Sequence, residues 1–158
     1  MDAFASTVTE LDLNITQWNV DPYPNGVHDL PVHVKEALRK GGELKVYIGD
    51  KEAEKIRWRS SQDLNAFEWN IGNETDWNNR VPIVRIRNVA KGLSHPALVK
   101  ANKKSRSVTS KICLCIFGPP NEDNPAGIEL PLRAKSQKER DHLVEMLVQW
   151  RDAATYNF

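Results

Sequence analysis

The sequence predicts a mainly β fold with α: seven strands in a strongly bent sheet or barrel, capped by a C-terminal amphipathic helix. Two observations lead to this fold class. Short runs of alternating apolar and polar residues recur between residues 44 and 132, and such period-2 patterns are typical of strands with one buried face. A long helical stripe of apolar residues follows residue 136. A strand meander closed by one helix favours a small curved sheet with that helix covering one end.

The strands are expected wherever the alternation is bounded by turn-forming residues. They are predicted at residues 44–48, 55–59, 67–71, 82–87, 88–91, 111–117 and 128–132. The segment 111–117 is apolar on both faces, as expected for a strand that is covered on both sides. The segment between residues 92 and 111 has no strand pattern and is expected to be a long basic loop.

A short helix is expected before the strands. Pro31 opens it, residues 32–40 form it, and the pair Gly41-Gly42 ends it. Residues 1–30 show weak periodicity and several turn-forming residues, so we interpret them as an N-terminal extension. The chain is long enough for one domain, which we place at residues 31–158.

A longer helix is expected after the strands. Ser136 is followed three residues later by Glu139, which resembles a capping box. The helix is predicted to run to about Ala154. Apolar residues at helical spacing mark the face that is expected to pack on the sheet: Leu143, Met146, Leu147 and Trp150.

The charges are unevenly distributed, although the net charge is only +1. Residues 1–34 contain five acids and neither Lys nor Arg. Residues 77–121 contain nine Lys or Arg and no acid. A segment of this kind can present a positive surface to phosphate groups.

The order and spacing of these segments resemble a known family. Over residues 34–154 the chain is similar to pleckstrin-homology (PH) domains, and within them to the subtype at the N-terminus of phosphoinositide-specific phospholipases C. The middle is also similar to PH domains of ELMO-like scaffold proteins. The matching segments are residues 34–46 (short helix, glycine, first strand), 63–69 (third strand), 82–92 (fourth and fifth strands), 112–117 and 128–132 (sixth and seventh strands). This resemblance implies a binding module rather than an enzyme.

The resemblance also implies a lipid-headgroup site. The family pattern is a Lys in the first strand and Lys/Arg-any-Arg in the second, and Lys45, Lys55 and Arg57 fit it. Alternation places Arg59 on the same polar strand face. Clustered cations suit a phosphorylated headgroup. The alternative is a solvated strand face. Tyr47 occupies a position that is basic in strong inositol-phosphate binders of the family.

Five further cations lie in or beside the predicted basic loop: Lys100, Lys103, Lys104, Arg106 and Lys111. Each Lys or Arg near an anionic membrane contributes about 1 kcal/mol, so this loop is expected to assist binding without selecting a headgroup. A diffuse patch does not require an inositol ring, so phosphatidic acid is as acceptable a lipid as a phosphoinositide. The alternative function is a PH-fold scaffold domain that binds a protein partner and no lipid. Tyr47 and the acidic residues of segment 49–54 favour it.

Other kinds of function find no support in the sequence. No catalytic motif is present. The four His and two Cys lack metal-ligand spacing, so neither a metal nor a cofactor is expected. Nucleic acid is not expected, because few aromatic residues accompany the basic stretch. Cys113 and Cys115 lie two apart in one predicted strand, which favours a reduced protein. We therefore expect a cytoplasmic monomer that associates peripherally with membranes.

Overall fold

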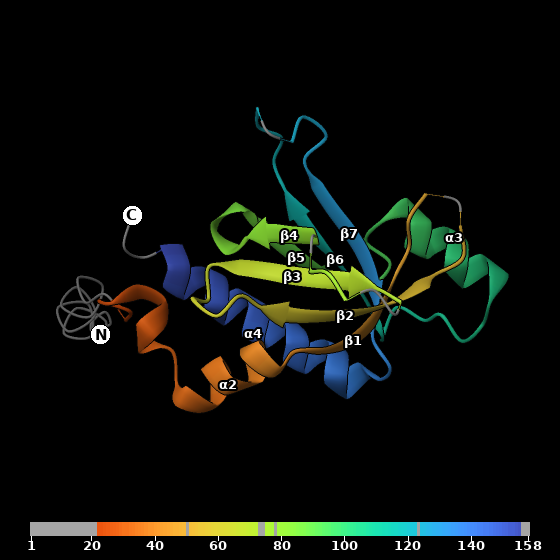
Figure 1. The fold of residues 1–158 in the computed structure, drawn as a ribbon. Coiled ribbons are helices and arrows are strands. Elements are labelled where there is room, and N and C mark those ends of the chain that lie inside the picture. The colour runs from red at the N-terminus through yellow and green to blue at the C-terminus, as the bar shows by residue number, and fades with distance from the viewer. Residues whose placement is uncertain (1–21, 50, 73–74, 78, 123, 156–158) are drawn as a thin grey trace, which may run out of the picture.

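Seven antiparallel strands form one sheet in the computed structural model, which describes residues 22–49, 51–72, 75–77, 79–122 and 124–155. Their order in the sheet is β4-β3-β2-β1-β7-β6-β5. The strands are β1 (Gly42–Val46), β2 (Glu54–Ser60), β3 (Ala66–Ile71), β4 (Asn79–Pro82), β5 (Asn88–Lys91), β6 (Cys113–Gly118) and β7 (Ile128–Arg133). The sheet bends so strongly that β2 and β3 cross the direction of β6 and β7 (Figure 1). The predicted fold class is confirmed.

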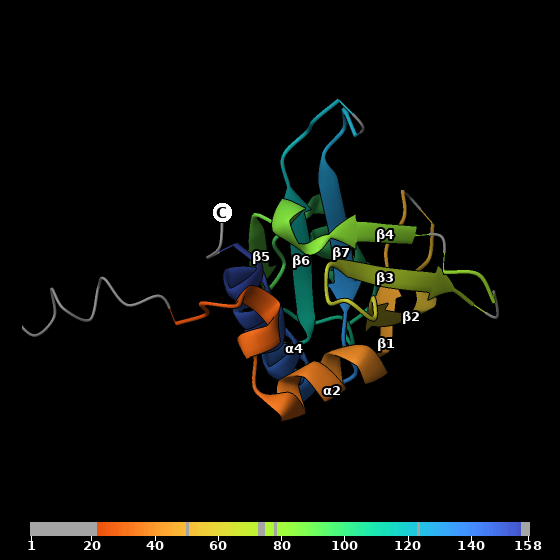
Figure 2. The same cartoon turned by 60° about the vertical axis from the view of Figure 1, so that its left-hand side comes forward.

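The C-terminal helix α4 (Gln137–Thr155) lies against the inner face of this bent sheet (Figure 2). Its start is the predicted capping box, because Ser136 Oγ accepts a hydrogen bond from the backbone N–H of Glu139 at 3.2 Å. The predicted stripe is buried, including Leu143, Leu147 and Trp150. These side chains join Leu114, Ile116, Leu132 and other inward-facing strand residues in what we call the main core.

Two N-terminal elements pack beside α4. The short 3-10 helix η2 (Gly26–Asp29) precedes α2 (Val32–Lys40), and the two lie with α4 on the same side of the sheet (Figures 1 and 2). Val27 and Leu30 are buried in the main core. These residues fall within the expected extension, of which residues 1–21 lie outside the described part of the chain. The domain boundary at residue 31 remains a prediction.

The segment 82–87 is not the strand expected from its alternation. Strand β4 ends at Pro82, and the 3-10 helix η3 (Ile83–Arg85) follows it. The Ile86 N–H donates to the Ile83 carbonyl at 3.1 Å, and this turn leads the chain from one half of the sheet to the other. Ile83 and Ile86 are both buried by the turn rather than by alternation along a strand.

The expectation of a loop throughout residues 92–111 is also wrong, because helix α3 (Pro96–Lys104) occupies its middle. His95 caps this helix: its Nδ1 accepts a hydrogen bond from the Ala97 N–H at 3.0 Å. Pro96 stands at the first helical turn, where its missing N–H costs nothing. The helix packs on the outer face of the sheet through Leu98, which is fully buried.

A separate hydrophobic cluster holds α3 in place. We call it the minor core, and its buried members are Tyr47, Leu98, Val108 and Cys113. Because successive strand residues face opposite sides, Cys113 of β6 points to the minor core while Leu114 points to the main core. Strand β6 is therefore covered on both faces, as its apolar sequence predicts.

Candidate functional site

A groove of about 700 Å³ lies between α3 and the connection from β1 to β2. Both elements lie at the same end of the molecule (Figure 1). Among the described residues, Glu52 is the one acid that lines the groove. The cations that line it are Lys45, Lys51, Lys100, Lys104 and Arg133, with His95 at the same wall. We call this feature the basic groove.

The sheet supplies one wall of the basic groove. Lys45 of β1 is paired with Arg133 of β7, so the two side chains stand side by side on the outer face. Tyr47 lies two residues further along β1 on the same face and is buried in the minor core. Burial raises the pKa of Tyr47, while the neighbouring Arg133 guanidinium opposes the rise. The phenol therefore stays neutral and forms an apolar floor next to the cations.

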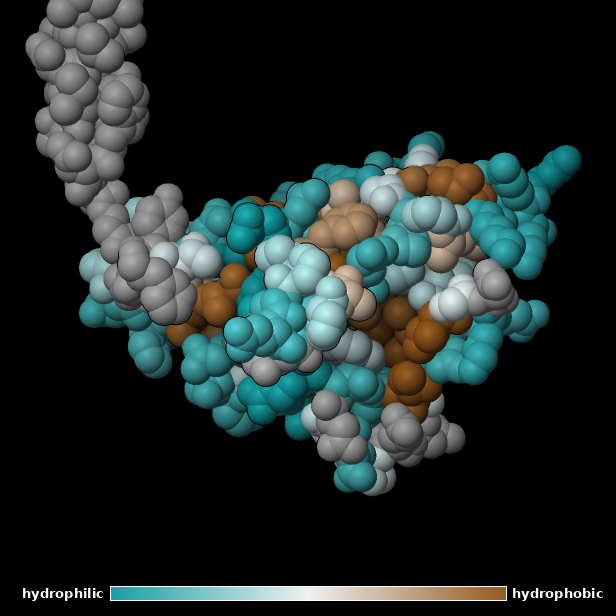
Figure 3. Space-filling model, turned by 90° about the horizontal axis from the view of Figure 1, so that it is seen from above, coloured by the Kyte–Doolittle hydropathy of each residue, from teal (hydrophilic) through white to brown (hydrophobic). Residues whose placement is uncertain are grey.

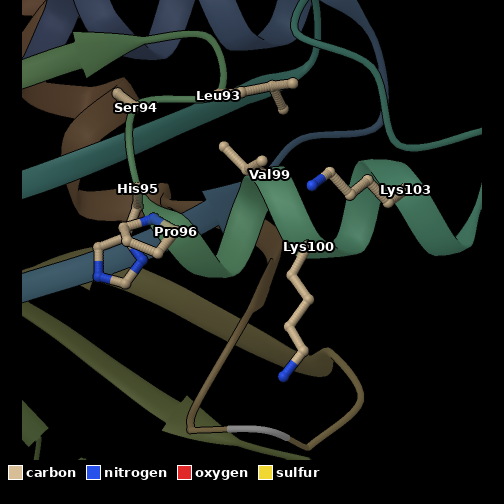
Figure 4. A pocket seen from close by; sticks show the side chains of 7 residues that line it. All are labelled: Leu93, Ser94, His95, Pro96, Val99, Lys100 and Lys103. Carbon is tan, nitrogen blue, oxygen red and sulfur yellow. The ribbon is translucent and has the colours of Figure 1, made fainter.

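Helix α3 supplies the opposite wall. Lys100 and Lys104 are four residues apart, so they share one face of the helix. Figure 4 shows Lys100 pointing away from Leu93 and Val99, which line a second hollow of about 570 Å³. Lys100 lies on the boundary between the two features, because it lines both of them. His95 ties the helix to β7, because its Nε2 lies 2.7 Å from Glu129 Oε1. With Nδ1 accepting the cap bond, Nε2 is the nitrogen that donates.

The second predicted cation, Lys55, lies outside the basic groove. It is the cross-strand partner of Lys45, but its Nζ lies 3.4 Å from Glu43 Oε2. Glu43 also forms an ion pair with Lys135, whose Nζ lies 3.1 Å from Glu43 Oε1. The two lysines hold the pKa of the Glu43 carboxyl below its usual value, and the hydrogen bond from Lys135 has the larger effect. The Lys55 charge is therefore already balanced in part by a neighbouring carboxylate.

Arg57 and Arg59, which were predicted to bind a headgroup, make cation–π contacts with an aromatic ring. Their guanidinium carbons lie 5.4 Å and 3.9 Å from the centre of the half-buried Trp77 ring. Arg59 also donates to Glu68 Oε1 at 3.2 Å, and Arg80 reaches the same carboxylate at 3.9 Å. Alternation correctly places Lys55 and Arg57 on the exposed face of β2. On that face Trp77 contacts both arginines, and Glu68 forms an ion pair with Arg59.

The remaining predicted cations have varied positions around α3. Lys103 lines the second hollow, close to Val99 (Figure 4). Arg106 and Lys111 are exposed and lie outside the basic groove. The structure thus brings together Lys45 from one predicted set with Lys100 and Lys104 from the other.

Sequence reasoning missed two groove residues. Lys51 stands in an otherwise acidic connection, which made the segment look unsuited to anions. Arg133 follows the alternating run of β7, and its outward position is readable from that run. Its proximity to Lys45 depends on the pairing of β1 with β7, which links segments almost ninety residues apart (45 against 133).

Other chemistry is not supported by the described residues. No cluster of three potential metal ligands occurs among them. None of their helices combines the length and apolar character needed to cross a bilayer. Cys113 and Cys115 are both buried as free thiols, and burial raises the pKa of Cys115 to about 12. A thiol of this kind is a packing residue rather than a nucleophile.

Comparisons with known proteins agree with the observed fold. No curated protein matches the chain. Among solved structures, the PH domain from TgAPH superimposes with a TM-score of 0.56 at 15% identity, covering 78% of this chain and 90% of that one. The inner membrane complex sub-compartment protein ISP1 from Toxoplasma gondii gives 0.55 at 14% identity, covering 75% and 88%. PLC21 of S. officinalis gives 0.54 at 16% identity, where 73% of this chain spans 16% of that protein.

Identities this low establish the fold alone. The family is established by the GAC PH domain model, which matches residues 25–158 and so includes every strand and helix described above. The PH fold is a non-catalytic module that serves in lipid binding or protein interaction. The chain belongs to the GAC PH domain family.

Proposed function

We propose that this domain binds anionic phospholipid headgroups in the basic groove and thereby recruits its protein to the cytoplasmic surface of a membrane. The observation that carries the proposal is the convergence of five cations from β1, β7, α3 and the β1–β2 connection on one groove with a single described acid. Phosphate oxygens are the acceptors that such a set of donors suits.

Three of the five groove cations, Lys45, Lys51 and Lys104, are the ones on which the proposal relies. Within the described part of the chain, Lys45, Lys51 and Lys104 make no ion pair, in contrast to Lys55. All three are exposed at the groove. Their positive charges repel one another across the groove, and a phosphate group placed among them would relieve that repulsion.

Exposed apolar side chains stand beside the groove and suit a lipid surface. Ile48, at the start of the β1–β2 connection, is 45% exposed, and Val99, on the opposite side of α3 from the groove, is 38% exposed. Hydrophobic patches lie between hydrophilic residues at the end of the molecule that carries α3 (Figure 3). In such an arrangement the cations contact lipid headgroups, while the apolar side chains enter the membrane interface.

The alternative is a protein-interaction module with the same fold. The observation that favours it is that cations on the exposed face of β2 already form ion pairs. Lys55 is paired with Glu43, and Arg59 is paired with Glu68. A face whose charges are already paired is less suited to a headgroup than to a partner protein. The two functions are separated by an experiment with lipids alone.

Sedimentation with vesicles tests the proposal. The vesicles are phosphatidylcholine alone, or with phosphatidic acid, or with a phosphatidylinositol bisphosphate. We expect binding to the acidic vesicles only. The double variant Lys45→Ala/Lys104→Ala should bind them at least about tenfold more weakly, because two charged hydrogen bonds are lost.

The control variant Lys55→Ala/Lys135→Ala removes the same charge from outside the groove, next to Glu43. It should stay within about twofold of the unmodified chain. Equal losses in the two double variants would show that the surface acts through its overall charge and that the groove is not the site. If the unmodified chain ignores every acidic vesicle, the protein-interaction function is the correct one.

A further inference from the structure

The C-terminal end of α3 carries two exposed hydroxyl groups at the rim of the basic groove. Ser105 is the C-cap residue of the helix and lines the groove. Its Oγ lies 2.8 Å from the Oγ of Ser107. Both serines are exposed. The turn that presents them is fixed by the Val108 N–H, which donates to the Ser105 carbonyl at 3.2 Å, and by Val108 itself, which is buried in the minor core.

The residues around these hydroxyls are strongly basic. Lys103 and Lys104 precede Ser105, and Arg106 separates the two serines. No acid occurs in the sequence between residues 77 and 121. An exposed serine between cations is complementary to the acidic substrate surface of a protein kinase that selects basic sequences. The phosphate-binding argument given above assigns no part to either hydroxyl.

We infer that Ser105 and Ser107 form a phosphorylation site that switches the basic groove off, an inference that rests on the proposed function. In the modification, a serine Oγ attacks the γ-phosphorus of ATP, supplied with a kinase of the basic-sequence class. The bond from that phosphorus to the β–γ bridging oxygen breaks, ADP leaves, and the hydroxyl proton passes to the kinase base. No oxidation or reduction takes place.

The phosphate would act on the groove in two ways. It carries a charge of about −1.5 to −2 at neutral pH, and from Ser105 it would compete for Lys104 and repel an incoming lipid phosphate. It would also stand at the C-terminus of α3, where the helix dipole already disfavours negative charge. The last turn of α3, which carries Lys103 and Lys104, is therefore expected to loosen.

The experiment treats the full chain with a basic-sequence-selective kinase and ATP. Mass spectrometry locates the phosphate, and vesicle sedimentation is measured before and after. We expect incorporation at Ser105 or Ser107, none in the variant Ser105→Ala/Ser107→Ala, and at least about fivefold weaker binding to acidic vesicles after modification. The alanine variant keeps all five groove cations and should show the same vesicle binding before and after treatment with the kinase.

A matched charge control separates a local effect from a change in net charge. Ser105→Glu adds a negative charge at the groove, whereas Ser110→Glu adds the same charge on an exposed residue that does not line it. Ser105→Glu should weaken vesicle binding by a larger factor. Absence of incorporated phosphate at both serines overturns the inference, and so does unchanged binding of the phosphorylated chain. If the unmodified chain shows no vesicle binding, the proposed function itself fails, and the switch fails with it.

Discussion

The indole N–H of Trp150 donates a hydrogen bond to the backbone carbonyl of Leu64, with Nε1 and O 2.7 Å apart. Trp150 is fully buried on α4, and Leu64 lies in the turn between β2 and β3. Leu64 has a φ of 60°, a conformation that is uncommon for residues other than glycine. The C-terminal helix therefore adds one buried hydrogen bond to those by which Ser61 and Asp63 already hold this turn.

Replacing Trp150 with Phe should lower the free energy of unfolding by about 1–3 kcal/mol from the hydrogen bond alone, because the Leu64 carbonyl would be left buried without its donor. Urea unfolding followed by circular dichroism measures the change. Trp58→Phe is the control, since Trp58 is also buried but is held by stacking on Phe67 at 5.5 Å between ring centroids. Equal losses in the two variants would contradict the role of the bond.

Two glycines with positive φ should respond very differently to alanine. A Cβ on Gly41 would lie 1.7 Å from the Trp58 carbonyl oxygen, whereas a Cβ on Gly49 meets nothing within 4 Å. Gly49→Ala should cost about 1–2 kcal/mol, which is the strain of the left-handed conformation. Gly41→Ala should cost clearly more, because β2 and the end of α2 must also separate. Thermal unfolding of both variants is the measurement, and a Gly41→Ala protein as stable as Gly49→Ala would contradict the expectation.

Arg140 is expected to stabilise the fold mainly through hydrogen bonds to backbone carbonyls. It is 5% exposed, and its Nη1 donates to the carbonyls of Ser110 and Cys113, both at 2.9 Å. Arg140→Met should lower the free energy of unfolding by about 3 kcal/mol, because two carbonyls lose their donor. Arg151→Met is the comparison, since Arg151 donates to a single carbonyl, that of Arg87. Chemical unfolding should rank Arg140→Met as the more damaging change, and the reverse order would refute this account.

The proposed apolar contribution to membrane binding can be tested without changing the net charge. Ile48→Ser should weaken binding to acidic vesicles by about 1 kcal/mol, or about fivefold, because a half-exposed isoleucine no longer enters the lipid interface. Since this term is not electrostatic, the loss should persist at high salt, where the lysine contribution fades. Val32→Ser is the control: Val32 is 67% exposed on α2, away from the groove. Equal effects at the two positions would show that Ile48 does not enter the membrane.

The sequence was sufficient for the parts of the fold that rest on local patterns. Ser136 and Glu139 predicted the start of α4, and the 3.6-residue spacing predicted its buried face. Helix α3 was missed because it is only nine residues long and four of its last five residues are polar, which leaves a short apolar face. The available signal was His95-Pro96 as a cap, followed by Leu98 and Ala101 three residues apart.

The candidate site was less predictable because it depends on contacts between distant segments. Alternation along one strand placed Lys55 and Arg57 correctly on an exposed face. It could not show that Glu43 would approach Lys55 from β1, since that contact follows from the register of two strands. The approach of α3 to Lys45 likewise depends on how the helix packs on the outer face.

The minor core beneath α3 shares no buried residue with the main core. Changes in packing that are confined to separate clusters are expected to be nearly additive. Changes to the buried side chains of α3 are therefore expected to act mainly on the minor core and to leave the packing of α4 on the sheet largely unchanged. The α3 wall of the basic groove can thus be altered with little effect on the main core, which makes this helix a suitable segment for changing the proposed ligand preference.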